Sequence, residues 1–180
     1  MEIEIIKGDQ LSDNTIDIMN QQRLHEYGEN TKDFRKNELE SIFFFVNNDS
    51  QIKAFGMLKP VRITYQGQSF QILGIGNIIA REKGQGWGKL LMSEIMGYLK
   101  RESHVGLGFC DKPVVGFYAN CGYDIIENLS TRFRYQYAKE TNGREILRNP
   151  RDILCFDTNQ SFINTLCSSD DLVYINVPFW

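Results

Sequence analysis

The stretch 72–101 constrains the fold of this chain more than any other part of it. Residues 72–79 are apolar apart from two glycines and one asparagine, which is typical of a buried strand. Glycine then occupies every second position at Gly84, Gly86 and Gly88, and a broad apolar stripe at helical spacing follows over 89–101. This order predicts a strand, a glycine loop and a helix that packs against a sheet.

The predicted loop is suited to bind an anion. Glycines lack the Cβ atoms that keep a ligand away from the main chain. The first N–H groups of the following helix lack intrahelical partners, and the helix dipole makes that end positive. We therefore expect a phosphate or a diphosphate as the ligand.

The spacing excludes the two commonest phosphate loops. A nucleotide-binding P-loop needs glycine where Lys83 stands and Ser or Thr where Leu90 stands, and the dinucleotide loop needs glycine in place of Lys89. Instead, Lys83-Gly84-Gln85-Gly86-Trp87-Gly88 resembles the Arg/Gln-x-x-Gly-x-Gly/Ala loop of the GNAT superfamily of acetyl-CoA-dependent N-acetyltransferases, with Lys in the first position.

A second segment carries the same resemblance. Tyr118 is followed four residues later by Gly122 and then by the aromatic Tyr123, in the order and at the separation from the loop that the family shows. The resemblance implies that the loop binds the diphosphate of coenzyme A. Lys83 keeps the positive charge of the family's Arg and loses its planar fork. The implied binding residues are Ile78, Lys83, Gly84, Gln85, Gly86, Trp87, Gly88 and Lys89.

The resemblance also implies the fold. It is mixed α/β (α+β), with a mostly antiparallel central sheet flanked by helices and two splayed parallel central strands that form the CoA cleft. We expect one domain over 1–180. The sequence predicts strands at 2–7, 42–46, 52–65, 70–79, 105–110, 132–137, 153–156 and 172–177, and helices at 13–28, 31–39, 89–101, 114–120 and 160–166.

Several local features sharpen this prediction. Asp13 or Asn14 is the expected cap of the first helix, and the charged helix at 31–39 is expected to cover the core without joining it. Pro60 should bend its strand or place it at an edge. Gly74 and Gly76 indicate a bulge, a close approach or ordinary core glycines. Asn149-Pro150 predicts a turn.

The implied reaction moves an acetyl group from acetyl-CoA to a primary amine by direct attack in a ternary complex. It needs an oxyanion donor, a base and an acid. The backbone N–H of Ile78 is the predicted donor, because Ile78 precedes the loop at the family's spacing. Tyr118 is the predicted acid, since a phenol with a pKa of about 10 keeps its proton at neutral pH. Cys110 as a nucleophile is less favoured than Cys110 as a buried thiol.

The base and the acceptor stay open. No Asp or Glu occurs between Gln71 and Ala80, so the candidates are a water held by Asn77 or a group of the first helices, which border the acceptor pocket in the family: His25, Glu26 or Glu29. Small-molecule amines, peptide N-termini and protein lysines are possible acceptors. The middle of the chain and its final Trp180 also resemble aminoglycoside 2'-N-acetyltransferases.

Composition fits a small enzyme domain. The 180 residues are 42% hydrophobic and 24% charged, enough for one core. Net charge is −3, which argues against a nucleic acid partner. The four cysteines form no CxxC pair and only two histidines occur, so we expect no metal site and reduced thiols. We expect a cytoplasmic protein with no membrane contact, because the N-terminus lacks a leader pattern and no apolar run is long enough to span a membrane. We also expect a monomer or homodimer.

Two rival hypotheses belong to other functional classes. The first is a non-catalytic CoA-binding or regulatory module that keeps the loop without acetyl transfer. The second is a phosphate-site protein that binds a nucleotide in place of CoA. Turnover across an acceptor panel separates the first from an enzyme, and binding of CoA compared with ATP separates the second.

Overall fold

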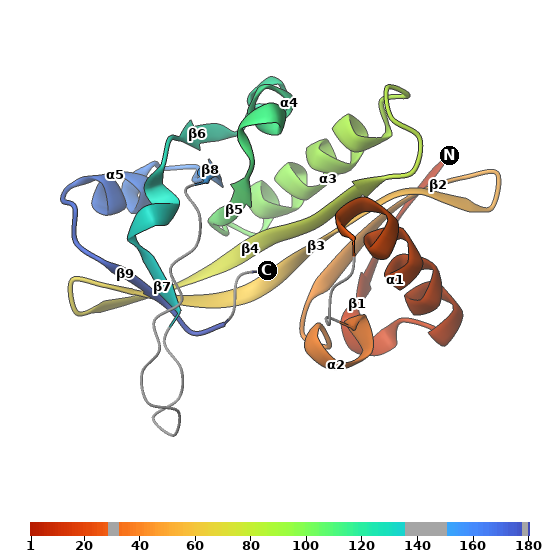
Figure 1. Cartoon of the computed structure of the whole chain (residues 1–180), viewed down its shortest axis with the longest axis horizontal. Coiled ribbons are helices and arrows are strands. Elements are labelled where there is room, and N and C mark those ends of the chain that lie inside the picture. The colour runs from red at the N-terminus through yellow and green to blue at the C-terminus, as the bar shows by residue number, and fades with distance from the viewer. Residues whose placement is uncertain (29–32, 136–150, 178–179) are drawn as a thin grey trace. The chain divides into compact units, whose positions relative to one another are not determined.

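The computed structural model describes residues 1–28, 33–135, 151–177 and 180 (Figure 1). The chain divides into two compact units, which we call unit 1 (Met1–Lys59 and Ile75–Gly97) and unit 2 (Pro60–Gly74 and Tyr98–Trp180). Three elements contribute residues to both units: strand β3 (Gln51–Tyr65), strand β4 (Gln68–Ala80) and helix α3 (Trp87–Arg101). The single domain over 1–180 stays a prediction.

Unit 1 is built on a strand that is buried on both faces. Strand β2 (Ile42–Asn48) pairs antiparallel with β1 (Glu2–Lys7) and with β3. Its consecutive residues 43–46 are all buried. Successive side chains of a strand point to opposite faces. One face therefore packs on Phe34 of helix α2 (Phe34–Asn37), and the other face lies on the side of α3.

The first helix has a different N-terminal cap from the one that the sequence suggested. Helix α1 (Asp13–Tyr27) is capped by Ser12, whose Oγ accepts a hydrogen bond from the backbone N–H of Thr15 at 3.1 Å. The prediction of Asp13 or Asn14 as the cap is wrong. Asp13 instead lies in the first turn, where its negative charge interacts favourably with the positive end of the helix dipole. The predicted end near Gly28 is confirmed.

Helix α2 belongs to the core, which corrects the expectation of a mere cover. Phe34 is only 1% exposed, and its ring meets Phe43 and Phe55 edge to face at centroid distances of 5.5 and 6.1 Å. The Arg23 guanidinium lies 3.7 Å from the same ring centroid. One buried aromatic ring is worth about 1.5–3 kcal/mol, so a mainly charged helix is anchored by a single residue.

Pro60 lies within β3 and does not end it. The last residue of β3 that pairs with β2 is Leu58, opposite Ile42. The first that pairs with β9 (Val173–Ile175) is Ile63, opposite Ile175. Proline has no N–H to donate to a ladder. Its place between these two pairings explains how one strand accommodates it.

Unit 2 contains the remaining strands. Strand β8 (Asp152–Phe156) pairs antiparallel with β5 (Gly106–Cys110) and with β6 (Asp124–Ile126). Strand β4 pairs parallel with β5, where the Leu73 N–H donates to the Val105 carbonyl at 2.9 Å. Strand β7 (Phe133–Tyr135) pairs parallel with β9. The helical segments are α4 (Val115–Asn120), α5 (Ser161–Cys167) and the short turns η2 (Lys112–Val114) and η3 (Leu129–Arg132).

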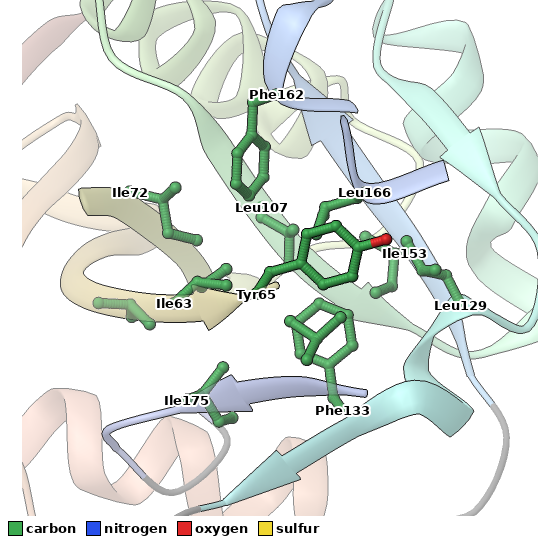
Figure 2. Close-up of a cluster of buried hydrophobic side chains, with 12 residues drawn as sticks. Ile63, Tyr65, Ile72, Leu107, Leu129, Phe133, Ile153, Phe162, Leu166 and Ile175 are labelled. Atoms are coloured by element: carbon green, nitrogen blue, oxygen red, sulfur yellow. The ribbon is translucent and has the colours of Figure 1, made fainter. Parts of the chain in front are cut away.

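The core of unit 2 is one apolar cluster, which Figure 2 shows around the ring of Tyr65. Side chains from β3, β5, β8 and α5 meet there, and Trp180 packs against its edge. The predicted strands and helices of this half are confirmed with small shifts of their ends. Positions 136–137 of the predicted strand, and the predicted turn at Asn149-Pro150, lie outside the described residues.

The predicted fold class is confirmed: the strands form a mixed, largely antiparallel sheet flanked by helices. The CoA cleft between splayed strands stays a prediction. All four cysteines are free thiols. Among the described residues, none of the helices combines the length and the apolar character that crossing a bilayer requires.

Candidate functional site

The glycine loop of unit 1 is an exposed turn between β4 and α3. Gly84 and Gly86 have φ angles of 78° and 82°, a left-handed conformation that favours glycine. A Cβ built on either residue would meet no other atom within 4 Å. These glycines therefore serve the shape of the turn and leave its main chain accessible from outside.

Helix α3 begins at Trp87, two residues before the predicted start. The Gly86 carbonyl accepts the first intrahelical hydrogen bond from the Leu90 N–H at 3.0 Å. The N–H groups of Trp87, Gly88 and Lys89 therefore precede the hydrogen-bond ladder of the helix. Three successive donors at a positive helix end, next to an open turn, are the arrangement that binds a phosphate group.

The last turn of α1 lies against this loop. Lys83 Nζ and Glu26 Oε1 form an ion pair at 2.7 Å, with 65% and 29% of the two side chains exposed. The neighbouring Tyr27 donates a hydrogen bond from its hydroxyl to the Ile78 carbonyl at 3.4 Å. Glu26 and Tyr27 thus connect α1 to the loop and to the end of β4, all within unit 1.

The backbone of β4 is irregular next to Ile78. Asn77 has a φ angle of 51°, and its side-chain amide donates to the Met57 sulfur at 3.4 Å. A left-handed residue inside a strand interrupts the pleat and redirects the next peptide group. The left-handed residue of β4 is therefore Asn77, and Gly74 and Gly76 keep negative φ angles. Gly74 instead permits a close approach, since a Cβ there would lie 2.5 Å from the Trp180 ring.

Tyr118 lies in α4 of unit 2 and is partly exposed. Its ring meets Phe117 edge to face at a centroid distance of 5.0 Å. The helix ends in a Schellman motif: Tyr123 N–H donates to the Tyr118 carbonyl and Gly122 N–H to the Ala119 carbonyl, at 3.2 and 2.9 Å. Gly122 has a φ angle of 90° and Tyr123 is buried, so these two residues stop and anchor the helix that carries Tyr118.

This chain is similar to known proteins in its fold but not in its sequence. No protein-family model and no curated protein matches the sequence. Among solved structures, ElaA from Escherichia coli superposes with a TM-score of 0.61 at 14% identity, over 87% of this chain and 99% of ElaA. The N-acetyltransferase from Staphylococcus aureus Mu50 superposes with a TM-score of 0.57 at 15% identity, over 87% of this chain and 98% of that protein.

A third structure is that of the GNAT family N-acetyltransferase YhbS from Escherichia coli in complex with CoA. It superposes with a TM-score of 0.51 at 14% identity and covers 96% of this chain and 88% of its own. The chain has the GNAT fold. The similarity to these structures is one of backbone fold and not of sequence. In this chain the glycine loop follows strand β4 and precedes helix α3.

On this GNAT fold, the structure brings some of the predicted residues together. Ile78 and the loop residues 83–89 lie in unit 1, where Glu26 contacts the same loop. Tyr118 lies in unit 2, so its meeting with the loop stays a prediction. Sequence reasoning missed Tyr27. The available signal was an aromatic residue directly before the glycine that ends the first helix.

The other candidates fare differently. Cys110 is 4% exposed, and burial raises the pKa of its thiol to about 11, with the Asp152 and Asp111 charges adding to the effect. Its thiolate is scarce at neutral pH, which favours the buried-thiol interpretation. Of the base candidates, His25 is exposed on α1, Glu26 is paired with Lys83, and Glu29 lies outside the described residues.

Two further observations concern ligands of other kinds. A hollow of about 700 Å³ in unit 1 is lined by β1, the start of α1 and the turn between β2 and β3. It reaches Arg81 but none of residues 83–89, so it is distinct from the glycine loop. Among the described residues, no three His, Cys, Asp or Glu side chains are grouped so that they could hold a metal ion.

Proposed function

We propose that this protein transfers an acetyl group from acetyl-CoA to the primary amine of a small molecule or peptide. The open glycine turn at the start of α3 carries the proposal, because the first N–H groups of the helix precede its hydrogen-bond ladder there and Lys83 lies in the same turn. The GNAT fold supports it, since its solved examples include N-acetyltransferases and one complex with CoA. Charge-assisted hydrogen bonds from N–H groups and an ammonium are the strong contacts for a diphosphate.

In this proposal, the residues of unit 1 bind the diphosphate of the coenzyme and polarise its thioester. The N–H groups of Trp87, Gly88 and Lys89 and the Lys83 ammonium hold the diphosphate. The Ile78 N–H, directly after the irregular Asn77, donates to the thioester oxygen as negative charge develops there. Removal of one such donor typically lowers kcat by about 10²–10³.

Proton transfers complete the reaction. The amine must lose its ammonium proton to a base before it attacks the carbonyl carbon, forming the new C–N bond. As the C–S bond breaks, the Tyr118 hydroxyl gives its proton to the departing thiolate. The proton that the nitrogen must still lose to become an amide then restores the Tyr118 phenol. A positioned acid of this kind contributes about 10²–10⁴ in rate. The base is left unassigned among His25, Glu26, Glu29 and a water bound by Asn77.

The test is an acceptor screen that measures free thiol released from acetyl-CoA. We expect release with at least one amine, and a large loss of kcat in Tyr118→Phe with little change in the KM for acetyl-CoA. Tyr174→Phe, at a half-buried tyrosine of β9, is the matched control and should retain activity.

Other outcomes separate the rivals. Binding of CoA by calorimetry without turnover on any amine would favour the non-catalytic module. Preference for ATP over CoA would favour a nucleotide site. Unchanged kcat in Tyr118→Phe would remove that residue from the mechanism while leaving acetyl transfer intact.

A further inference from the structure

The ammonium that the proposed function assigns to the diphosphate already has a carboxylate partner. Glu26 Oε1 lies 2.7 Å from Lys83 Nζ, a direct contact between residues 57 positions apart in the sequence. A diphosphate oxygen on the same ammonium would come close to this carboxylate. Two negative groups at one exposed lysine repel each other, and the diphosphate has the additional support of the helix N–H groups.

We propose that Glu26 competes with the coenzyme for Lys83, so that CoA binding exchanges the Glu26–Lys83 ion pair for a Lys83–diphosphate pair. This inference rests on the proposed function. Glu26 thereby sets the affinity for the coenzyme without contacting it, and the exchange frees the last turn of α1 from the loop.

The last turn of α1 is built to respond to this exchange. Leu24 and Tyr27 are 52% and 55% exposed, so burial of apolar surface does little to hold the turn in place. The ion pair of Glu26 and the 3.4 Å hydrogen bond from Tyr27 to the Ile78 carbonyl are polar contacts that join it to the loop and to β4. Because Glu26 and Tyr27 are adjacent, loss of the ion pair also loosens the contact at Ile78, the proposed oxyanion donor.

Glu82 provides a matched control in the same loop. It lies next to Lys83 in the sequence, but its Oε1 pairs with Lys53 Nζ at 3.0 Å. Glu82→Gln and Glu26→Gln therefore remove the same charge near the diphosphate site. Only Glu26→Gln also frees Lys83.

The first experiment measures the Kd of CoA by calorimetry in the full chain and its variants. Exposed ion pairs are weak, so we expect Glu26→Gln to bind CoA about three- to tenfold more tightly than the parent, and clearly more tightly than Glu82→Gln. Lys83→Gln should weaken binding. In the Lys83→Gln background, Glu26→Gln should add no more than Glu82→Gln adds.

The second experiment follows amide hydrogen exchange in the peptide that covers residues 24–28, whose Gly28 N–H donates to the Leu24 carbonyl. Saturating CoA should accelerate exchange there in the parent. Glu26→Gln should exchange at the faster rate before CoA is added. Equal unfolding midpoints of parent and variants would show that the fold is retained.

The outcomes keep the two proposals apart. If the parent binds no CoA, the proposed function fails and this inference fails with it. If the parent binds CoA but Glu26→Gln gains no more than Glu82→Gln, the competition is refuted and the proposed function stands. If affinity rises as expected but exchange at 24–28 does not respond to CoA, the release of the turn is refuted.

Discussion

Gly56 makes room for the residue that we propose as oxyanion donor. It lies in β3 opposite Phe44 of β2. A Cβ at Gly56 would lie 2.5 Å from Ile78 Cδ1, 3.3 Å from Leu91 Cδ2 and 3.4 Å from Ile95 Cδ1. Carbon atoms pack at about 3.5–4.0 Å, so the first contact is a clash and the other two are merely tight. Gly56→Ala therefore tests whether the Ile78 side chain is held where the structure places it.

The size of the effect follows from these distances. Overpacking of a core typically costs about 1–3 kcal/mol, and the lower backbone entropy of Ala relative to Gly returns about 0.5–1 kcal/mol. We expect Gly56→Ala to lower the free energy of unfolding by up to about 2.5 kcal/mol, the difference of these two ranges. Ile78→Val deletes Cδ1, the clashing atom, and alone should lower it by about 0.5–1.5 kcal/mol. The double variant should be less destabilised than the sum of the two single effects, and this difference should be about 1–2 kcal/mol.

The assay is urea unfolding at equilibrium for the four proteins of this double-mutant cycle, with constant m-values as the check on comparability. Gly97→Ala is the control. A Cβ at Gly97 would meet no atom within 4 Å, so the same substitution in α3 should stabilise by about 0.5–1 kcal/mol. Strictly additive effects of Gly56→Ala and Ile78→Val would refute the explanation by contact with Cδ1.

Three further predictions follow from single contacts. Lys59→Met should lower the free energy of unfolding in urea by about 3 kcal/mol. It removes the ammonium 2.8 Å from the Glu38 carboxylate, which is 2% exposed and keeps its hydrogen bond from the Ser41 hydroxyl; Glu38→Gln should restore part of the loss. Gly86→Ala should weaken CoA binding about tenfold by calorimetry, because a left-handed φ of 82° strains alanine by about 1–2 kcal/mol and the turn relieves this strain by leaving the shape that presents its N–H groups to the diphosphate. In the folded protein, alkylation followed by mass spectrometry should label exposed Cys167 at pH 8, whereas Cys110 labelling should rise only as the pH nears 11, since its raised pKa keeps the thiol protonated below that pH.

The parts that the sequence predicted well depend on local chemistry. Turn conformations at Gly84 and Gly86, the helix after them and the glycine stop at Gly122 follow from what glycine and helix ends do wherever they occur. Two such segments at one separation were enough to predict the GNAT fold, although no family model matches the sequence. Local rules chose between neighbours less well, as at Ser12, which caps α1 in place of Asp13.

The parts that the sequence missed depend on contacts across the chain. Phe34 joins the core because rings from β2 and β3 surround it, although its own helix is mostly charged. The Glu26–Lys83 pair joins residues that no spacing rule connects. The irregular residue of β4 is Asn77, since asparagine tolerates a left-handed conformation, whereas Gly74 was required for the Trp180 ring.

The glycines of this chain therefore divide by what would occupy the position of a missing Cβ. At Gly84 and Gly86 that position is open and the backbone is left-handed, so the absent side chain leaves the main chain free for a ligand. At Gly56 and Gly74 it is filled by Ile78 and Trp180, and the absent side chain serves packing. Alanine should accordingly lower both CoA affinity and stability at the first pair, whereas at Gly74, where it would contact the Trp180 ring, it should lower stability more than affinity. A loss of CoA affinity at Gly74 as large as that at Gly86 would contradict this division.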